Sequence, residues 1–207
     1  MRHVSTRPRG FLYNNTMAGK NGYHHGNLKE TLLNIGMKSL EEHGAENLSL
    51  RQLAELAGVS KNAPYRHFPT KDLFLGELVS RGYKTLYELL EKCIPGQGTV
   101  KNSSGLSEFG KGVIRFACSQ PALYRLMNSE LICRMPDEQM VWPRKTLELL
   151  SSRLTGREGF KGYDATVAAW AYMHGLAMLK IDNLFPALDP EPDWNALAGA
   201  VGSFFTI

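Results

Sequence analysis

The clearest hydrophobic pattern in the chain lies between residues 48 and 73, where apolar positions recur at helical spacing. Four of them stand at i, i+3, i+4 and i+7 and so share one face of a helix: Leu50, Leu53, Ala54 and Ala57. Ser49 precedes this face as a candidate N-cap, and Gly58 follows it, where a chain leaving a helix often takes a positive φ. Ser60 is then a candidate N-cap for a second helix. The pattern predicts two short helices joined by a glycine turn, which is the arrangement of a helix-turn-helix unit.

The predicted second helix carries several hydrogen-bond donors within two turns of its start: Lys61, Asn62, Tyr65, Arg66 and His67. Such side chains, together with the partial positive charge of a helix N-terminus, suit contacts with phosphates and base edges. The alternative is an ordinary corner between two helices with a solvated polar face. The donors, the cap and a basic segment upstream together favour DNA binding. Pro64 has no amide hydrogen and crowds the carbonyl four residues back, so we expect a distorted first turn.

Helical spacing continues on both sides of this unit. A helix is predicted from Asn27 to His43, with its inner face formed by Leu28, Leu32, Ile35 and Leu40. Thr70 is the expected N-cap of a helix of more than about twenty residues that ends near Cys93, and a breaker-rich loop follows. Further helices are expected over residues 106–118, 121–133, 138–154, 164–185 and 191–205.

No stretch of the sequence alternates between apolar and polar residues as a strand would, so the expected fold class is all-α. The expected organisation is a flexible basic arm over residues 1–22, a helix-turn-helix domain over residues 23–70 and a second helical domain over residues 71–207.

The predicted helix near residues 164–185 is apolar on all sides. Between Val167 and Leu179 the only polar side chain is that of His174, and a helix of this kind must be buried all round. The second domain is too small to enclose it easily, so part of its surface is expected to pack on another subunit. The last helix permits close contact through small residues: Gly199, Ala200 and Gly202. The two helices therefore predict a homodimer with a two-fold symmetric four-helix interface.

The composition agrees with a globular protein. Apolar residues make up 43% of the chain and charged residues 21%. No apolar run approaches the roughly 18 residues that span a membrane, and the run Phe11–Tyr13 is too short for a signal peptide. The three cysteines are scattered without metal-binding spacing, as expected for idle thiols in a reducing compartment: Cys93, Cys118 and Cys133. We therefore expect a cytoplasmic protein with no membrane segment.

The formal net charge of +4 lies in the first 23 residues, which contain no acidic residue and four basic ones: Arg2, Arg7, Arg9 and Lys20. A basic arm ahead of a helix-turn-helix domain can contact phosphates or enter a minor groove. Two other interpretations stay open, namely a plain tail or a chain that starts at Met17.

Other chemical patterns are weak. His24 and His25 are adjacent and lack a spaced third ligand, so no metal site is expected. The segment Gly156–Gly162 has three glycines but follows no predicted strand, so it does not qualify as a phosphate-binding loop. We find no arrangement of nucleophile and base, and no carboxylate pair, that indicates catalysis. Neither an enzyme nor a cofactor is expected.

The segment from Leu48 to Leu73 resembles the N-terminal domain of the TetR family of bacterial transcriptional regulators. The resemblance rests on these stretches: Leu48–Ala54, Ala57–Ser60, Tyr65–Phe68, Lys71–Leu73 and, upstream, Tyr23–Leu28. Many members have Gly-x-Leu-Tyr where this chain has Asn62-Ala63-Pro64-Tyr65. The branch named for its Trp-His-Gly motif has the Ala-Pro-Tyr form, and the C-terminal half is similar to that branch through Trp170, His174-Gly175 and Pro121–Met127.

The resemblance implies a ligand-responsive transcriptional regulator, most commonly a repressor that a small-molecule effector releases from its double-stranded DNA operator. The residues then expected to contact DNA are Ser49, Arg51, Ser60, Lys61, Asn62, Ala63, Tyr65, Arg66, His67 and Lys71. Bases would be met by Lys61, Asn62 and Ala63. Phosphates would be met by Ser49, Tyr65, His67 and Lys71.

The resemblance also implies an effector pocket and a dimer interface within residues 71–207. The expected pocket residues are Phe116, Tyr124, Met127, Trp170, Met173 and His174. Aromatic and methionine side chains at helical spacing are also ordinary core residues, so a DNA-binding protein without an effector remains the alternative.

Overall fold

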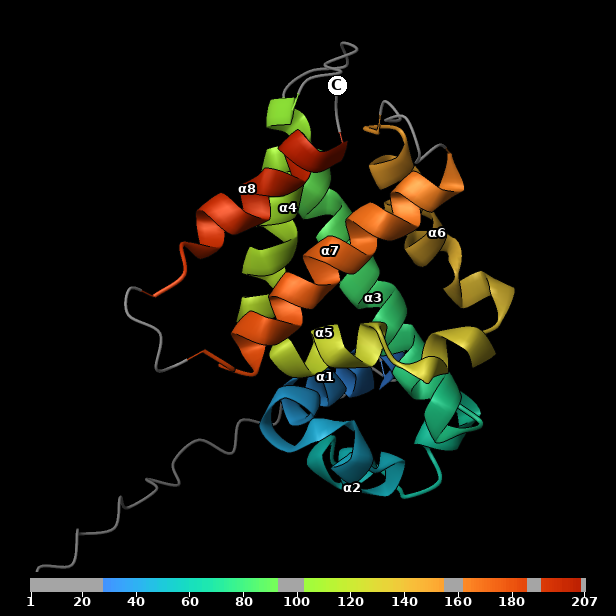
Figure 1. Cartoon of the computed structure of the whole chain (residues 1–207). Coiled ribbons are helices and arrows are strands. Elements are labelled where there is room, and N and C mark those ends of the chain that lie inside the picture. Colours follow the sequence, from blue (N-terminus) through green and yellow to red (C-terminus); the bar gives the residue numbers. More distant parts are fainter. Residues whose placement is uncertain (1–27, 93–102, 155–161, 186–190, 206–207) are drawn as a thin grey trace, which may run out of the picture.

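The computed structural model describes residues 28–92, 103–154, 162–185 and 191–205, and within these ranges every regular element is a helix (Figure 1). The all-α fold class is therefore confirmed. The α-helices are α1 (Leu28–Asn47), α2 (Leu50–Leu56), α3 (Lys71–Lys92), α4 (Ser103–Ser119), α5 (Pro121–Met127), α6 (Val141–Ser151), α7 (Tyr163–Ile181) and α8 (Trp194–Phe205). Three short 3₁₀ helices complete the order: η1 (Pro64–Arg66), η2 (Glu130–Arg134) and η3 (Asp137–Gln139). The basic arm of residues 1–22 lies outside the described residues.

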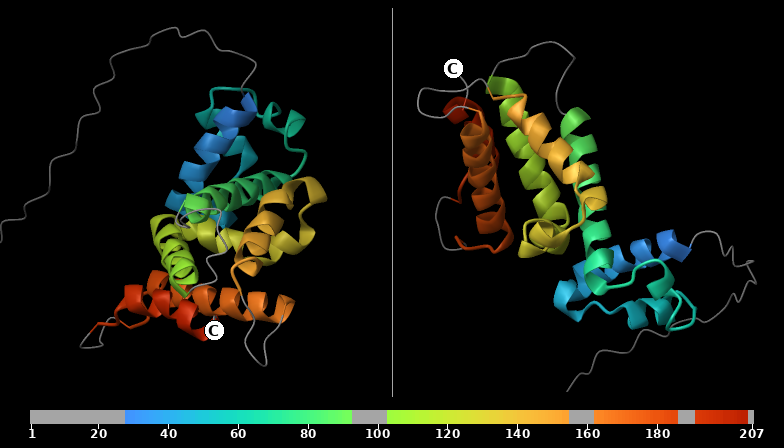
Figure 2. Two further views of the ribbon diagram at one scale, coloured as in Figure 1. Left: turned by 90° about the horizontal axis from the view of Figure 1, so that it is seen from above. Right: turned by 90° about the vertical axis from the view of Figure 1, so that its right-hand side faces the viewer.

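A small unit of α1, α2 and η1 lies at one end of the molecule, and α3 runs from it into a larger group of helices (Figure 1; Figure 2, right). Buried leucines of α1 and α2 form the core of the small unit together with Phe68 and Phe74, whose rings meet edge to face with centroids 4.9 Å apart. Gly36 makes room for this pair, because a Cβ there would lie 2.3 Å from Cζ of Phe74. The first helix follows regular geometry as far as His43 and then breaks at Gly44, where φ is 78°.

The larger group is built on α3 and α4. The α6 helix packs along α3, while α4 packs against both α7 and α8. The α7 and α8 helices form one outer layer, at the lower edge of the left view in Figure 2. The crossing of α4 and α8 is close, because a Cβ on Gly110 would lie 2.2 Å from the backbone oxygen of Ala198.

Four of the predicted helices are shorter than expected, and the largest differences are at α5 and α6. The helix expected over residues 121–133 ends at Met127, where the Tyr124 backbone oxygen accepts both from the Asn128 amide at 3.3 Å and from the Asn128 side chain at 2.9 Å. The Ser129 hydroxyl then accepts from the amide of Leu131 and starts η2. The helix expected over 138–154 begins at Val141, after the 3₁₀ turn of η3. The Thr70 cap is confirmed by a bond of 3.2 Å from the Leu73 amide to the Thr70 Oγ1.

Within one chain, α7 is buried on one side only. Its buried positions are Ala165, Thr166, Ala169, Met173 and Ala177. Val167 on the opposite side is 49% exposed. One chain thus leaves part of the apolar surface of α7 uncovered, and the prediction that a second subunit packs on that part stays a prediction. None of the helices in the described ranges has the length and hydrophobicity needed to cross a membrane.

Candidate functional site

The turn after α2 has the geometry that the glycine signal predicted. Gly58 takes a φ of 67°, and the Val59 amide bonds back to the Ala54 oxygen at 2.9 Å. The start of α2 differs from expectation. The Ser49 backbone oxygen accepts from the Leu53 amide at 3.0 Å, but the Ser49 hydroxyl makes no capping hydrogen bond, so the predicted side-chain cap is wrong.

The second element of the unit is not a regular helix, and Pro64 supplies the reason. The Ala63 amide bonds to the Ser60 oxygen at 2.9 Å, only three residues back, and Pro64 has no amide hydrogen with which to continue. The chain then forms the 3₁₀ turn η1, in which the Pro64 oxygen accepts from the amides of His67 and Phe68 at 3.0 and 2.9 Å. The predicted distortion is confirmed, but the predicted regular helix capped by Ser60 is wrong.

This compact turn places the predicted donors on the surface. Five of them are exposed: Lys61, Asn62, Tyr65, Arg66 and His67. Pro64 and Phe68 point inward and are buried, so the segment is held from below while its donors face out. A hollow of about 570 Å³ lies beside them, between Leu28 at the start of α1 and the turn from Gly58 to Ser60. An exposed group of cationic and amide donors on such a hydrogen-bonded turn can bind phosphates and base edges.

Three other predicted contact residues lie around this group. Arg51 is exposed on α2, while Ser49 is half-buried and borders a second hollow between α1 and α2. Lys71 has a structural partner, because its Nζ donates to the Glu46 backbone oxygen at 2.9 Å. Lys71 therefore ties the start of α3 to the end of α1.

A second site is a cavity of about 260 Å³ in the larger group of helices. Two predicted pocket residues line it, Met127 and Trp170. Its other lining residues were not predicted from the sequence and come from α3, the end of α5, η2, α6 and α7: Tyr83, Asn128, Ile132, Leu147, Tyr163, Thr166 and Val167. These residues belong to five separate elements, so no periodic pattern in the sequence groups them. Predicting the cavity would have required knowing that Trp170 packs beside Tyr83 of the long α3 helix, which residue spacing does not reveal.

The cavity wall is apolar with a few neutral polar groups. The Tyr83 ring lies nearly parallel to that of Trp170, with centroids 6.5 Å apart, and its hydroxyl donates to the Met127 oxygen at 3.3 Å. Burial raises the pKa of Tyr83, so this phenol stays protonated. None of the described residues that line the cavity is an acid, a lysine or an arginine. The cavity is therefore suited to an uncharged ligand.

The other four predicted pocket residues lie outside the cavity lining. Phe116, Tyr124 and Met173 are buried in the core. His174 is half-buried, and its Nδ1 lies 3.3 Å from the Tyr124 hydroxyl. Burial lowers the pKa of His174 and raises that of Tyr124, so this pair is neutral at neutral pH.

Metal and thiol chemistry adds little. No cluster of three histidine, cysteine, aspartate or glutamate side chains occurs in the part of the chain that the structure describes. Cys118 and Cys133 are free and exposed. The His24–His25 pair, Cys93 and the glycine-rich segment at residues 156–161 lie outside the described residues.

The molecule combines an exposed helix-turn-helix surface with a separate all-helical domain, and one long helix joins the two. It is therefore a helix-turn-helix protein of the two-domain, all-helical class. Residues 32–78 match the family described as bacterial regulatory proteins, tetR family. Residues 106–201 match the tetracyclin repressor-like C-terminal domain, which is of the Trp-His-Gly type. The chain belongs to the TetR family.

Individual relatives are more distant. The chain is 25% identical over 100 residues to the HTH-type transcriptional regulator Rv1816 of Mycobacterium tuberculosis, a match that covers 48% of this chain and 43% of that protein. The match thus spans less than half the length of this relative. A protein of unknown function from Rhodococcus sp. RHA1 has a similar structure, with a TM-score of 0.71, 26% identity and coverage of 90% of this chain and 97% of that one. A TetR variant from Acinetobacter baumannii AYE in complex with minocycline shares the fold, with a TM-score of 0.58, 20% identity and coverage of 85% and 94%.

Proposed function

We propose that the protein is a ligand-responsive, sequence-specific DNA-binding regulator of transcription, and that it is a repressor which a small molecule releases from its operator. The observation that carries this proposal is the rigid, exposed group of donors from Lys61 to His67, placed at the head of a long helix that reaches the cavity. A bacterial regulator of this kind acts in the cytoplasm, which is the location that we propose.

The proposed contacts divide by chemistry. Lys61 and Asn62, with Ala63 beside them, would meet base edges, since an amide side chain can pair with adenine and a cation with guanine. Tyr65, Arg66 and His67 would meet phosphates, with support from the more peripheral Ser49, Arg51 and Ser60. Lys71 would contribute less than the sequence predicted, because its ammonium is already bound to the Glu46 oxygen.

A homodimer through α7 and α8 would present two such surfaces. Large apolar side chains are exposed on these helices, among them Val167 at 49% and Phe204 at 50%. Burying this layer against a second copy would hide apolar area and impose two-fold symmetry. The two surfaces would then meet successive major grooves about 34–36 Å apart, or a multiple of that distance.

The cavity is the proposed effector site. Tyr83 places one wall of it on α3, which is the helix that begins in the DNA-binding unit. A ligand that fits the cavity better in one arrangement of α3 than in another would shift the spacing of the two DNA-binding units. The alternative is a DNA-binding protein without an effector, and a screen of uncharged small molecules for a rise in melting temperature distinguishes the two.

The deciding experiment is selection of bound duplexes from a random pool with the full chain at moderate salt. We expect an enriched palindrome with half-sites at the spacing of one helical turn or a multiple of it. Retention of DNA only at low salt, with no enriched sequence, would indicate non-specific electrostatic binding and would contradict the proposal.

A further inference from the structure

The start of α5 is capped by a side chain from the DNA-binding unit. The Glu41 carboxylate on α1 accepts from the Leu123 amide at 2.8 Å and from the Ala122 amide at 3.1 Å. The side chain of Gln120, the residue at the N-cap position, makes no such bond, and Pro121 has no amide hydrogen to satisfy. A carboxylate is well suited to this place, since helix N-termini have free amides and partial positive charge. The cap that α5 lacks locally is thus supplied from another domain.

The other end of α5 reaches the cavity and α7. Met127 lines the cavity, and its backbone oxygen accepts from Tyr83 of α3. Arg125 forms an ion pair with Asp182 at the end of α7. The helix also lies tightly on α3, because a Cβ on Gly82 would be 2.6 Å from the Met127 Sδ. With so little free space between Met127 and α3, a change in the size or position of Met127 presses on the backbone of α5.

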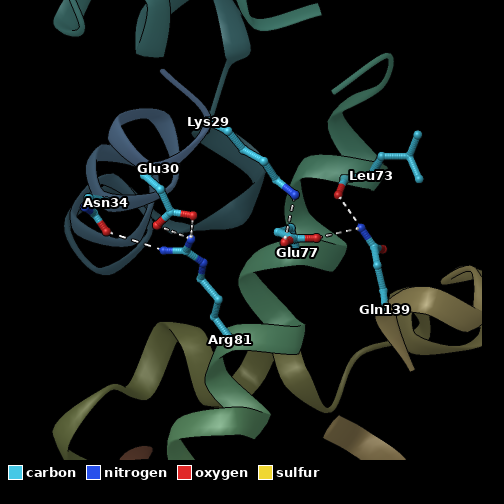
Figure 3. Close-up of polar contacts among 7 residues, drawn as sticks. All are labelled: Lys29, Glu30, Asn34, Leu73, Glu77, Arg81 and Gln139. Carbon is cyan, nitrogen blue, oxygen red and sulfur yellow. Dashed lines mark hydrogen bonds and ion pairs between the residues drawn. The ribbon is translucent and has the colours of Figure 1, made fainter. Parts of the chain in front are cut away.

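A separate set of contacts joins α1 to α3 (Figure 3). Arg81 of α3 reaches Glu30 at 2.5 Å and Asn34 at 3.4 Å, and Glu77 pairs with Lys29 at 3.1 Å. These contacts hold the beginning of α1. Glu41 lies eleven residues beyond Glu30, which is about 16 Å further along the helix axis. The first helix is therefore held by α3 near its start and again at Glu46 near its end, where Lys71 binds, and it is held by α5 at Glu41.

We propose that Glu41 is a positioning residue that links the cavity to the DNA-binding unit through α5. The proposal rests on the proposed function of the cavity as the effector site. Because Tyr83 of α3 and Met127 of α5 line the same cavity, a ligand that changes their separation shifts the α5 contact of α1 relative to the α3 contacts of α1. The DNA-binding unit then turns about its long helix, and α3 alone does not carry the movement.

The test measures how a change at the cavity end of α5 is felt in α1, by amide hydrogen exchange on the full chain. Met127→Leu is the change, and Met127→Ala is a stronger second version of it. In the otherwise unchanged protein, each should accelerate exchange in the last two turns of α1 by about threefold or more, as expected for coupled neighbouring sites. In the Glu41→Gln background that acceleration should disappear, because the two backbone amides bond to different carboxylate oxygens and glutamine replaces one of these oxygens with an NH₂ donor that would face a backbone N–H.

Glu42→Gln is the matched control, since Glu42 is the next residue on α1 and its carboxylate pairs only with His43 among the described contacts. The effect of the Met127 substitutions on α1 should persist in this background. Equal effects in the Glu41→Gln and Glu42→Gln backgrounds, or no effect on α1 in any background, would overturn the proposal. If Met127→Ala also accelerated exchange in α4 and α8, that variant would be reporting general unfolding. The comparison of backgrounds would then be made with the milder Met127→Leu.

Neither DNA nor a ligand enters this measurement, so its result is independent of the operator selection. A failed selection together with loss of coupling in Glu41→Gln would refute the proposed function and leave the linkage standing. A successful selection, together with coupling that persists in Glu41→Gln, would support the proposed function and refute the linkage through Glu41. With a selected operator in hand, Met127→Leu should change operator affinity in the Glu42→Gln background and leave it unchanged in the Glu41→Gln background.

Discussion

His174 has its protonation state set by its surroundings. Its ring lies against the buried Tyr124, and burial lowers its pKa below the ordinary value of 6.5. The unfolded chain therefore binds a proton at a pH where the folded chain does not, and the free energy of unfolding falls as the pH drops below about 6.5. Above that value the contribution is complete. The pair is thus a neutral hydrogen bond that acid weakens.

We predict that His174→Gln reduces this pH dependence. The free energy of unfolding, measured by urea denaturation at pH 7.5 and pH 5.5, should fall by less in the variant than in the unchanged protein, because glutamine does not titrate. The same loss of stability in both proteins would show that another group is responsible.

Substitution of Asn62 is the most direct test of the proposal that this segment reads bases. Its amide is exposed at the tip of the turn and can donate and accept at once. Asn62→Ala should relax the preference at one base pair of each half-site, at a cost of about 1–3 kcal/mol against the favoured base. A repeated selection with the variant measures this.

Arg66→Ala is the comparison for this prediction. It should weaken binding to all sequences alike and reduce the salt dependence of binding. If Asn62→Ala also weakened binding to all sequences alike, Asn62 would not have the proposed base-reading role.

At the scale of elements, the crossing of α4 and α8 depends on a missing side chain. A Cβ on Gly110 would meet the backbone oxygen of Ala198 at 2.2 Å, and a backbone atom cannot move aside without moving its helix. We predict that Gly110→Ala destabilises the protein by about 1–3 kcal/mol in spite of the better helix propensity of alanine. Denaturant unfolding measures the change.

Gly112→Ala, two residues further along the same helix, is the control for this prediction. Its Cβ would approach Leu90 and Leu89 at 2.8 and 3.1 Å, but through the ends of flexible side chains that can shift. Its cost should therefore be the smaller of the two, partly offset by the gain of about 1 kcal/mol in helix propensity. If both variants lost the same stability, the rigid backbone contact would not be the cause.

The elements also show how far local sequence signals extend. The all-α class, the turn at Gly58 and the cap at Thr70 were predictable, because each depends on residues within a few positions of one another. The end of α5 at Met127 was not predictable, since asparagine occurs both within helices and at their ends. Which of the two applies at Asn128 depends on packing. At Pro64 the sequence predicted a distorted turn, but whether a regular helix resumed depended on the buried Phe68 that anchors the chain beyond it.

The sites divide in the same way. The exposed donors all lie in the short segment from Lys61 to His67, so the sequence alone predicted that they are neighbours. The cavity joins residues more than eighty positions apart, from Tyr83 to Trp170, and helical periodicity cannot distinguish an apolar residue that faces a cavity from one that faces the core. For this reason Met127 and Trp170 lie on the cavity wall while Phe116 and Met173 lie in the core.

At the scale of the whole molecule, the exposed apolar layer on α7 and α8 is the surface through which we propose that two copies, and so two DNA-binding units, pair. Phe204 on α8 is 50% exposed and packs edge to face on Tyr172 of α7, with centroids 5.5 Å apart. We predict that Phe204→Lys weakens self-association by more than about tenfold, because a charge replaces an aromatic group in a contact that must exclude water. Sedimentation over a range of protein concentrations measures this.

Leu56→Lys is the matched control for the dimer, because Leu56 is a 66% exposed leucine on α2, far along the chain from the proposed interface. Self-association should be unchanged in this variant. Loss of the dimer in Phe204→Lys should also lower operator affinity, since a monomer binds one half-site and forgoes the second. If Phe204→Lys remained dimeric while Leu56→Lys dissociated, the interface would lie on the DNA-binding unit, and the proposed spacing of the two recognition surfaces would have to be derived from a different two-fold axis.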